Sequence, residues 1–207
     1  MAARVDSLNG ALRKVPAGLL YLVSVAWAAW LFYLGLTGGL GVEPINALER
    51  EYGETALKLI VVGLAITPLR TYARINLLKF RRAIGVSAFF FVLAHFLVWA
   101  VLDVQSVDRI WQDVVKRPYV TVGMLAFVLM VPLALTSNNW SLRRLGGAAW
   151  RRLHKLTYPV AVLGAIHYLW LVKGFQIEPL VYLVVILGLL ILRIRWKGRV
   201  GTPVSAR

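Results

Sequence analysis

The sequence predicts an all-α fold: a polytopic membrane helical bundle of six transmembrane helices with both termini in the cytoplasm. Of the 207 residues, 59% are apolar and 16% are charged, whereas a soluble domain has about 45–50% apolar and about 25% charged residues. The apolar residues stand in long blocks, and about 20 such residues span a membrane as a helix. Basic residues gather in alternate connecting segments, which indicates how the bundle is oriented in the membrane.

Six apolar blocks define the spans, at about 16–36, 55–69, 83–102, 119–135, 155–172 and 179–195. The first block is too long for the apolar region of a secretory signal and lacks a cleavage site after it, so we expect an anchor. The second is predicted to end at Thr67-Pro68, because proline has no N–H to continue a helix. Residues 16–195 form the membrane domain, between a cytoplasmic N-terminal segment (1–15) and a cytoplasmic tail (196–207).

The distribution of charge sets the predicted orientation. The chain has 24 Lys and Arg residues and 9 Asp and Glu residues. The N-terminus, the 70–82 and 136–155 segments and the C-terminal end hold 18 of the basic residues and one acid, Asp6. By the positive-inside rule these four segments lie in the cytoplasm. The net charge of +15 is therefore interpreted as topology and contact with membrane lipid, with no nucleic acid as a partner.

The absence of cysteine and the positions of the charged residues exclude several classes of function. The chain has no cysteine, which excludes disulfides, cysteine-bound iron–sulfur clusters and covalent haem attachment through C-x-x-C-H. No acidic residue lies inside a predicted span, which argues against a carboxylate proton relay or a cation-coupled transporter. The basic pairs Arg81-Arg82, Arg143-Arg144 and Arg151-Arg152 fit lipid head-group contact best, with the phosphate of a flavin nucleotide as the alternative.

Two of the three histidines lie at matching depth in predicted spans. His95 is 12 residues beyond Ala83, and His167 is 12 residues beyond Lys155, which places each about 18 Å from the inner boundary. An ionisable residue inside a span indicates a functional site. Two imidazoles at one depth on neighbouring helices can bind a haem iron from opposite faces. The alternative is that each histidine hydrogen-bonds another helix.

The third histidine is predicted at the cytoplasmic boundary. His154 precedes His167 by 13 residues, about 20 Å along a helix axis. A second haem there would need a ligand 13 or 14 residues before His95, where Arg82 and Arg81 stand. An interfacial histidine in a basic segment is the favoured interpretation, and a ligand of a second haem is the alternative.

Several segments resemble the ferric-reductase-like transmembrane proteins. The run Arg81-Arg82-Ala83-Ile84-Gly85, which leads to His95, resembles the third-span motif of that family. Further segments are similar to its MsrQ branch, the haem-binding membrane subunits of the bacterial periplasmic methionine sulfoxide reductase system. They are Thr67-Pro68-Leu69-Arg70, 117–123 (RPYVTVG), 133–137 (LALTS) and 150–156 (WRRLHKL). The resemblance extends from about Gly18 to Leu192.

The resemblance implies a b-type cytochrome in the bacterial inner membrane. It implies electron flow from the quinone pool or a cytoplasmic flavin reductase to MsrP, a soluble periplasmic molybdenum-cofactor enzyme that reduces protein methionine sulfoxide. The chain would then be an electron-transfer subunit and not itself the reductase. The implied cofactors are haem b and FMN, with His95 and His167 as ligands of the haem iron and His154 as a third ligand. Di-haem members of the wider family carry two histidines on each of two helices, whereas the third span here has only His95.

The sequence as a whole predicts an electron relay with at least one haem near the periplasmic side. The outer connections carry a set of acids, namely Glu43, Glu49, Glu51, Asp103, Asp108 and Asp113. Simple solvation of the outer segments is the favoured interpretation of these acids, and a docking surface for the partner is the alternative. One alternative is a self-contained haem ferric or quinol oxidoreductase that uses the same two histidines. Another is a cofactor-free transporter or structural membrane protein.

Overall fold

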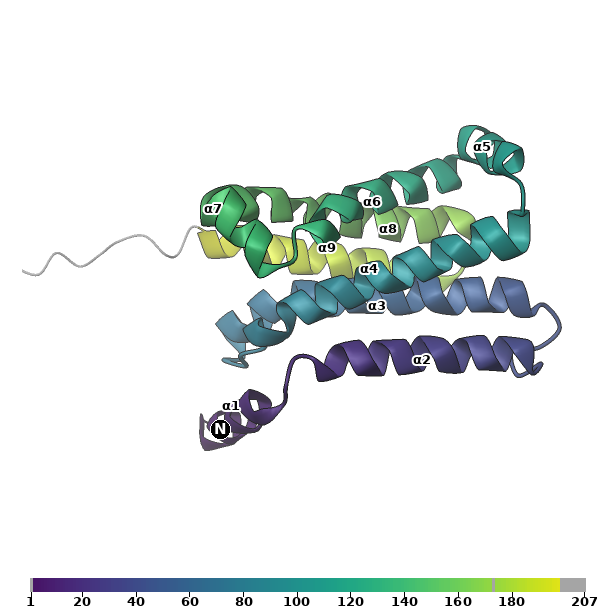
Figure 1. Cartoon of the computed structure of the whole chain (residues 1–207). Helices are drawn as coiled ribbons and strands as arrows, with labels where there is room; N and C mark the ends of the chain where they lie inside the picture. Colours follow the sequence, from purple (N-terminus) through teal and green to yellow (C-terminus); the bar gives the residue numbers. More distant parts are fainter. Residues whose placement is uncertain (1, 173, 198–207) are drawn as a thin grey trace, which may run out of the picture.

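The computed structural model describes residues 2–172 and 174–197, and the elements within them are all helical (Figure 1). The α-helices are α1 (Ala2–Lys14), α2 (Leu19–Leu36), α3 (Pro44–Tyr72), α4 (Arg81–Leu97), α5 (Val107–Lys116), α6 (Pro118–Leu135), α7 (Asn139–Leu153), α8 (Thr157–Leu171) and α9 (Ile177–Lys197). Three short helices are η1 (Leu78–Phe80), η2 (Val98–Val104) and η3 (His154–Leu156). Most of the predicted tail, 198–207, lies outside the described residues.

Each predicted span overlaps a helix of the structure. Within the described residues, α2, α3, the continuous run Leu78–Val104 and α6 are each long and apolar enough to cross a membrane. α8 has 15 residues and is preceded directly by η3, and α9 has 21 residues. Four candidate membrane spans are therefore found, and six spans with cytoplasmic termini stay a prediction.

The predicted end of the second span at Pro68 is wrong. α3 begins at Pro44 and continues through Pro68 to Tyr72. Pro68 cannot donate the helical hydrogen bond to the carbonyl of Leu64. The guanidinium of Arg193 in α9 donates to that oxygen instead, at 2.6 Å. A side chain 129 positions away thus satisfies the carbonyl that the proline leaves free, and the helix continues.

The connecting segments contain more helix than the sequence analysis expected. Most of the 37–58 connection belongs to α3, whose first residue, Pro44, suits a first helical turn because an N–H would be unpaired there. α5 and α7 occupy the next two long connections. α7 begins after Asn138, whose side chain accepts a hydrogen bond from the N–H of Ser141. These helices carry many charged residues, so a search for apolar blocks misses them.

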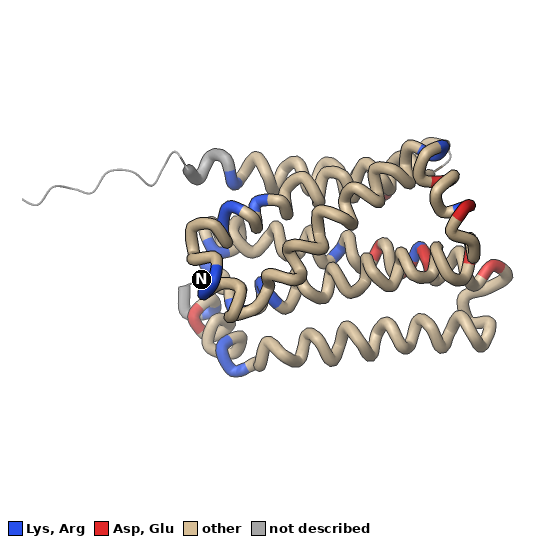
Figure 2. Tube along the Cα trace, turned by 45° about the horizontal axis from the view of Figure 1, so that its top comes forward, with Lys and Arg blue, Asp and Glu red and all other residues tan. Residues whose placement is uncertain are grey.

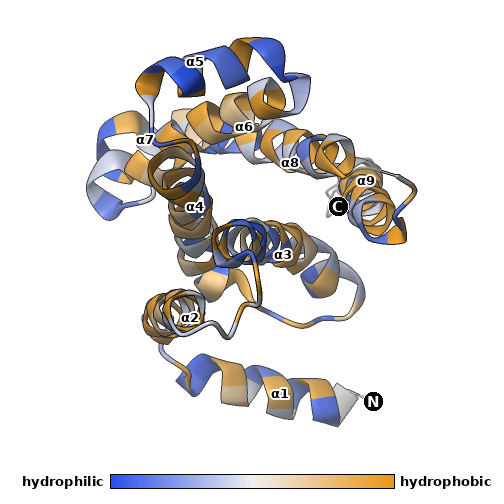
Figure 3. Ribbon diagram, turned by 90° about the vertical axis from the view of Figure 1, so that its right-hand side faces the viewer, coloured by the Kyte–Doolittle hydropathy of each residue, from blue (hydrophilic) through white to orange (hydrophobic). Residues whose placement is uncertain are grey.

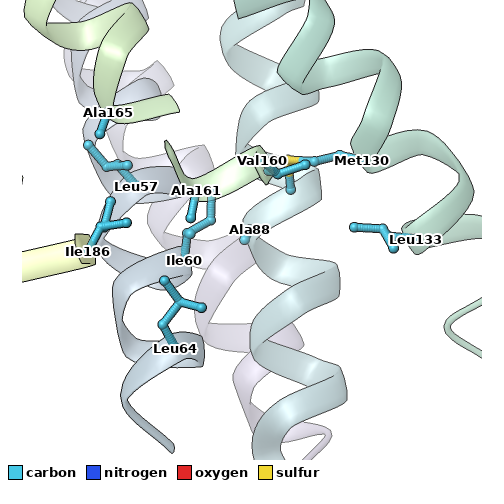
Figure 4. Close-up of a cluster of buried hydrophobic side chains, with 10 residues drawn as sticks. All are labelled: Leu57, Ile60, Leu64, Ala88, Met130, Leu133, Val160, Ala161, Ala165 and Ile186. Carbon is cyan, nitrogen blue, oxygen red and sulfur yellow. The ribbon is translucent and has the colours of Figure 1, made fainter. Parts of the chain in front are cut away.

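The main core lies where α3, α4, α6 and α8 meet, with one residue from α9. Figure 4 shows its buried side chains, which are Leu57, Ile60, Leu64, Ala88, Met130, Leu133, Val160, Ala161, Ala165 and Ile186. Alanines on α4 and α8 let the helix backbones approach closely. Large apolar side chains such as Leu22, Val128 and Val184 face outward instead. That pattern is typical of a helical bundle surrounded by lipid.

Opposite charges occupy opposite ends of the bundle. Figure 2 shows Lys and Arg concentrated at one end and most Asp and Glu toward the other. We call these the basic end, where α1, η1 and α7 lie, and the acidic end, where α5 and the start of α3 lie (Figure 1). α5 lies across the acidic end, beside α6 (Figure 3). The fold thus separates the charges along the axis of the long helices, as the predicted topology requires.

Candidate functional site

His95 of α4 and His167 of α8 meet inside the bundle. Their ring centres are 6.1 Å apart, and the two ring planes are nearly perpendicular, at 79°. Two imidazoles that bind one metal ion from opposite sides, each about 2 Å from the metal, have ring centres about 6 Å apart. The two histidines that the sequence placed at equal depth thus lie side by side, and the pair has the spacing of two axial ligands.

Backbone carbonyls fix the chemical state of both rings. Nδ1 of His95 lies 2.9 Å from the carbonyl oxygen of Glu49, and Nδ1 of His167 lies 2.7 Å from that of Tyr119. A carbonyl only accepts, so each Nδ1 carries the proton and donates it. Each Nε2 then carries the lone pair that a metal binds. The carbonyls also hold the orientation of the rings, which is how proteins commonly position metal-binding histidines.

Two glycines give the rings their space. A Cβ atom on Gly53 of α3 would lie 3.2 Å from Nδ1 of His95. A Cβ atom on Gly123 of α6 would lie only 2.7 Å from Nδ1 of His167. Each histidine therefore packs directly on the backbone of a neighbouring helix. Any larger residue at position 123 forces the imidazole to move.

The two rings line a cavity between α3, α4, α6 and α8, which we call the histidine cavity. Its wall is mainly apolar, and Glu49, Arg50 and Glu54 are the charged residues among its described lining. Trp99, four residues after His95, and Gly164, three residues before His167, line it. Phe91 does not, because its ring packs toward Tyr52 and Phe90.

His154 lies in η3, at the basic end. Its ring stacks on Trp150, with centres 3.8 Å apart, and its Nε2 lies 3.1 Å from the hydroxyl of Thr136. Burial, and after it the charges of Arg81 and Arg82, lower the pKa of His154, so the ring is neutral at pH 7. The structure does not bring His154 together with a second histidine.

His154 lines a second and larger cavity, of about 610 Å³, at the basic end. Arg81, Arg82 and Arg193 also line it, and we call it the arginine cavity. Three residues line both cavities, namely Ile60, Met130 and Val160. The two cavities thus lie one above the other along the bundle, with a layer of apolar side chains shared between them.

Comparison with known proteins decides the family. The model of the family "Ferric reductase like transmembrane component" matches residues 52–165. A protein of Brucella anthropi is 43% identical over 189 residues, which cover 90% of this chain and 86% of that protein. A protein of Agrobacterium fabrum is 43% identical (87% of this chain, 86% of that protein), and one of Brucella ovis is 44% identical (85% and 80%). All three are named "Protein-methionine-sulfoxide reductase heme-binding subunit MsrQ". The chain belongs to the MsrQ family of ferric-reductase-like transmembrane proteins.

Membership of the MsrQ family confirms the resemblance that the sequence motifs indicated, and it agrees with a multi-pass membrane protein. Sequence reasoning nevertheless missed the two glycines beside the rings and the carbonyls of Glu49 and Tyr119. Gly123 stands in one of the MsrQ-like segments, 117–123, and this was the available signal. Which histidine a glycine faces depends on how the helices pack, so the sequence alone does not pair Gly123 with His167.

Proposed function

We propose that the chain is a b-type cytochrome subunit that relays electrons across the bacterial inner membrane. Its donor would be the quinone pool or a reduced flavin such as FMN from a cytoplasmic flavin reductase. Its acceptor would be a periplasmic molybdenum-cofactor enzyme of the MsrP type, which reduces protein methionine sulfoxide. The relatives support the methionine sulfoxide system through their name, and the donor and acceptor follow from the family resemblance.

The paired imidazoles carry this proposal. Their ring spacing of 6.1 Å, their Nδ1 bonds to carbonyls and the mainly apolar wall around them fit a haem b held through Nε2 of His95 and Nε2 of His167. Haem iron supplies one-electron redox chemistry when bound. The protein residues would hold the two nitrogens and keep both in one protonation state.

The two ends of the bundle fit different tasks in this proposal. The histidine cavity lies toward the acidic end, because its lining includes the start of α3 and of α6. An acceptor would dock there, where Glu43, Asp108 and the other predicted acids lie. The donor would approach the basic end, where residues of α4, α7 and α8 are among those that line the arginine cavity.

A second haem with His154 as a ligand stays a prediction. Among the described residues that line the arginine cavity, His154 is the single histidine. Nε2 of His154 already contacts Thr136. To bind a second iron, His154 would therefore have to break its contact with Thr136 or bind the iron through Nδ1. The other ligand of that iron would have to be a residue other than histidine. The ratio of haem to protein in a purified sample decides between one haem and two.

The absorption spectrum of the purified protein tests the main proposal. We expect a sharp Soret band and resolved bands on reduction, and we expect His95→Ala and His167→Ala each to abolish the spectrum of the haem between them. His154→Ala should keep it, because His154 lies at the other end of the bundle. Equal loss from all three substitutions, or a colourless protein that does not take up haem, would refute the assignment.

A second arm separates the relay from a self-contained oxidoreductase. The purified chain is loaded with haem and reduced. It is then mixed with a protein that contains methionine sulfoxide, with and without an MsrP-type enzyme. Sulfoxide reduction that needs the added enzyme supports the relay. The alternative is supported if ferric iron or a quinone reoxidises the haem at the same rate with and without the MsrP-type enzyme.

A further inference from the structure

α5 is an amphipathic helix that lies outside the group of long helices. Figure 1 shows it almost along its axis at the acidic end. Figure 3, viewed from that end, shows α5 lengthwise on the outer side of α6, away from α3. The axis of α5 therefore runs across the long helices. Because the long helices cross the membrane, α5 runs along the membrane surface.

One side of α5 packs on the bundle. Ile110 and Val114, which are one helical turn apart, pack against a buried cluster that contains Trp99 and Val120. The hydroxyl of Thr121 in α6 donates a hydrogen bond to the carbonyl oxygen of Val114. These contacts fix the rotation of α5 about its own axis, so the directions of its other sides are fixed as well.

A second apolar side of α5 is exposed. Trp111 and Val115, also one turn apart, are 69% and 65% exposed, and we call them the outer stripe. Each follows a residue that faces the bundle by one position, which turns it about 100° further round the helix. Arg109 and Lys116 lie on the side of the helix opposite Trp111 and are exposed. α5 therefore has one side toward the bundle, one apolar exposed side and one charged side.

The outer stripe continues the lipid-facing surface of the neighbouring helices. α5 packs beside η2 and α6. Leu97 and Val101, on the apolar run that ends in η2, are exposed, and so is Leu125 on α6. Along the long helices such side chains face the acyl chains of lipid. Exposed apolar surface thus extends along both neighbours of α5 toward the outer stripe.

The composition of α5 indicates which surface it fits. Its charged residues are two Asp, one Arg and one Lys, which give no net charge. A helix that binds anionic lipid carries an excess of Lys and Arg, and electrostatic steering of a protein partner also needs a net charge. Tryptophan is enriched at the level of the lipid head groups. α5 therefore suits the boundary between the head groups and the acyl chains of lipid, whatever the charge of that lipid.

We propose that α5 lies in the head-group layer of the membrane leaflet at the acidic end, with Trp111 and Val115 inserted among the lipids. The charged side of the helix then faces water. Trp99 and Val120 belong both to the cluster beneath α5 and to the wall of the histidine cavity. Contact of α5 with lipid therefore also supports one wall of that cavity.

Fluorescent labels on single cysteines test the proposal, because the chain has no cysteine of its own. Trp111→Cys and Val115→Cys report on the outer stripe, and Arg109→Cys and Lys116→Cys are matched controls on the charged side of the same helix. Each full chain is labelled with a bimane group and placed in lipid discs of phosphatidylcholine. Bromine atoms on the acyl chains quench a label inside the membrane, and iodide in the buffer quenches a label in water. Circular dichroism checks that the helix content of each chain is unchanged.

We expect brominated lipid to quench the labels at positions 111 and 115 at least about threefold more than those at positions 109 and 116, and iodide to show the reverse order. The same pattern should appear in discs that contain phosphatidylglycerol and at high salt, because α5 has no net charge. Trp111→Gln, made in the Val115→Cys chain, should lower the quenching by brominated lipid. Arg109→Gln in the same chain should leave that quenching unchanged, because Arg109 faces water.

Quenching by iodide alone at positions 111 and 115 would overturn the proposal. If that quenching then falls when an MsrP-type enzyme is added, the outer stripe is a docking surface for a protein and not for lipid. A pattern that needs phosphatidylglycerol, or that disappears at high salt, would also overturn the proposal, because it would show attraction by charge. None of these measurements needs haem, so their outcome is independent of the assignment of His95 and His167 as haem ligands.

Discussion

At the scale of single residues, the histidine cavity depends on contacts between rings and backbone. His95 and His167 each donate Nδ1–H to a carbonyl on a neighbouring helix, and each ring lies against a glycine. The carbonyl sets the protonation of the ring, and the glycine sets its position. Both contacts come from backbone atoms, so the positions of the two rings depend on helix packing as much as on the histidines themselves.

Gly123→Ala should displace His167 and weaken haem binding. The added methyl would lie 2.7 Å from Nδ1 of His167, closer than atoms can approach, so the ring must move away from the carbonyl of Tyr119. We expect loss of most of the haem absorbance or a clear shift of the Soret band. Elsewhere in a helix, glycine to alanine stabilises by roughly 0.5–1 kcal/mol, so lower helix propensity cannot cause the loss.

Gly85→Ala is the control for this substitution. Gly85 also lies inside a helix, α4, which carries His95, but a Cβ there meets no atom within 4 Å. Its absorption spectrum should match that of the wild-type chain. A Gly123→Ala protein with the wild-type spectrum and full haem content would show that the imidazole of His167 does not occupy the described position.

At the scale of elements, the apolar blocks predicted the positions of the long helices, and His95 and His167 were predicted to pair from their depth alone. The helices lie where the blocks stand and the two rings are neighbours, because helix length and rise follow from local chemistry and from membrane thickness. The sequence did not reveal that α3 continues through Pro68, because its compensating partner, Arg193, is 129 residues away. It also missed α5 and α7, because their charged residues interrupt the apolar pattern.

The partnership of Pro68 and Arg193 predicts a measurable coupling between α3 and α9. Arg193→Met should destabilise the wild-type chain by about 1–3 kcal/mol, because the Leu64 carbonyl loses its donor inside the bundle. The same substitution should cost less in a Pro68→Ala chain, where a backbone N–H can bind that carbonyl. Unfolding by denaturant in mild detergent, measured for all four chains, gives the coupling energy, which we expect to be about 1 kcal/mol. Equal costs in both backgrounds would mean that Arg193 does not replace the missing hydrogen bond.

At the scale of the whole molecule, the charge separation and the two cavities follow one axis. Lys and Arg gather at the basic end and acids gather toward the acidic end (Figure 2). The histidine cavity and the arginine cavity follow one another along the same axis, with Ile60, Met130 and Val160 between them. The proposed direction of electron flow thus depends on which end faces the cytoplasm.

The orientation can be measured because the chain has no cysteine. Single cysteines are introduced at exposed positions, with Ser7→Cys and Arg144→Cys at the basic end and Val107→Cys on α5 at the acidic end. Bacterial spheroplasts are then treated with a maleimide that does not cross membranes. The positive-inside rule predicts that Val107→Cys reacts in intact spheroplasts, and that Ser7→Cys and Arg144→Cys react only after the membrane is opened. Labelling of Ser7→Cys or Arg144→Cys from outside would reverse the assignment of the two ends. The histidine cavity would then lie on the cytoplasmic side, where a periplasmic acceptor cannot reach it.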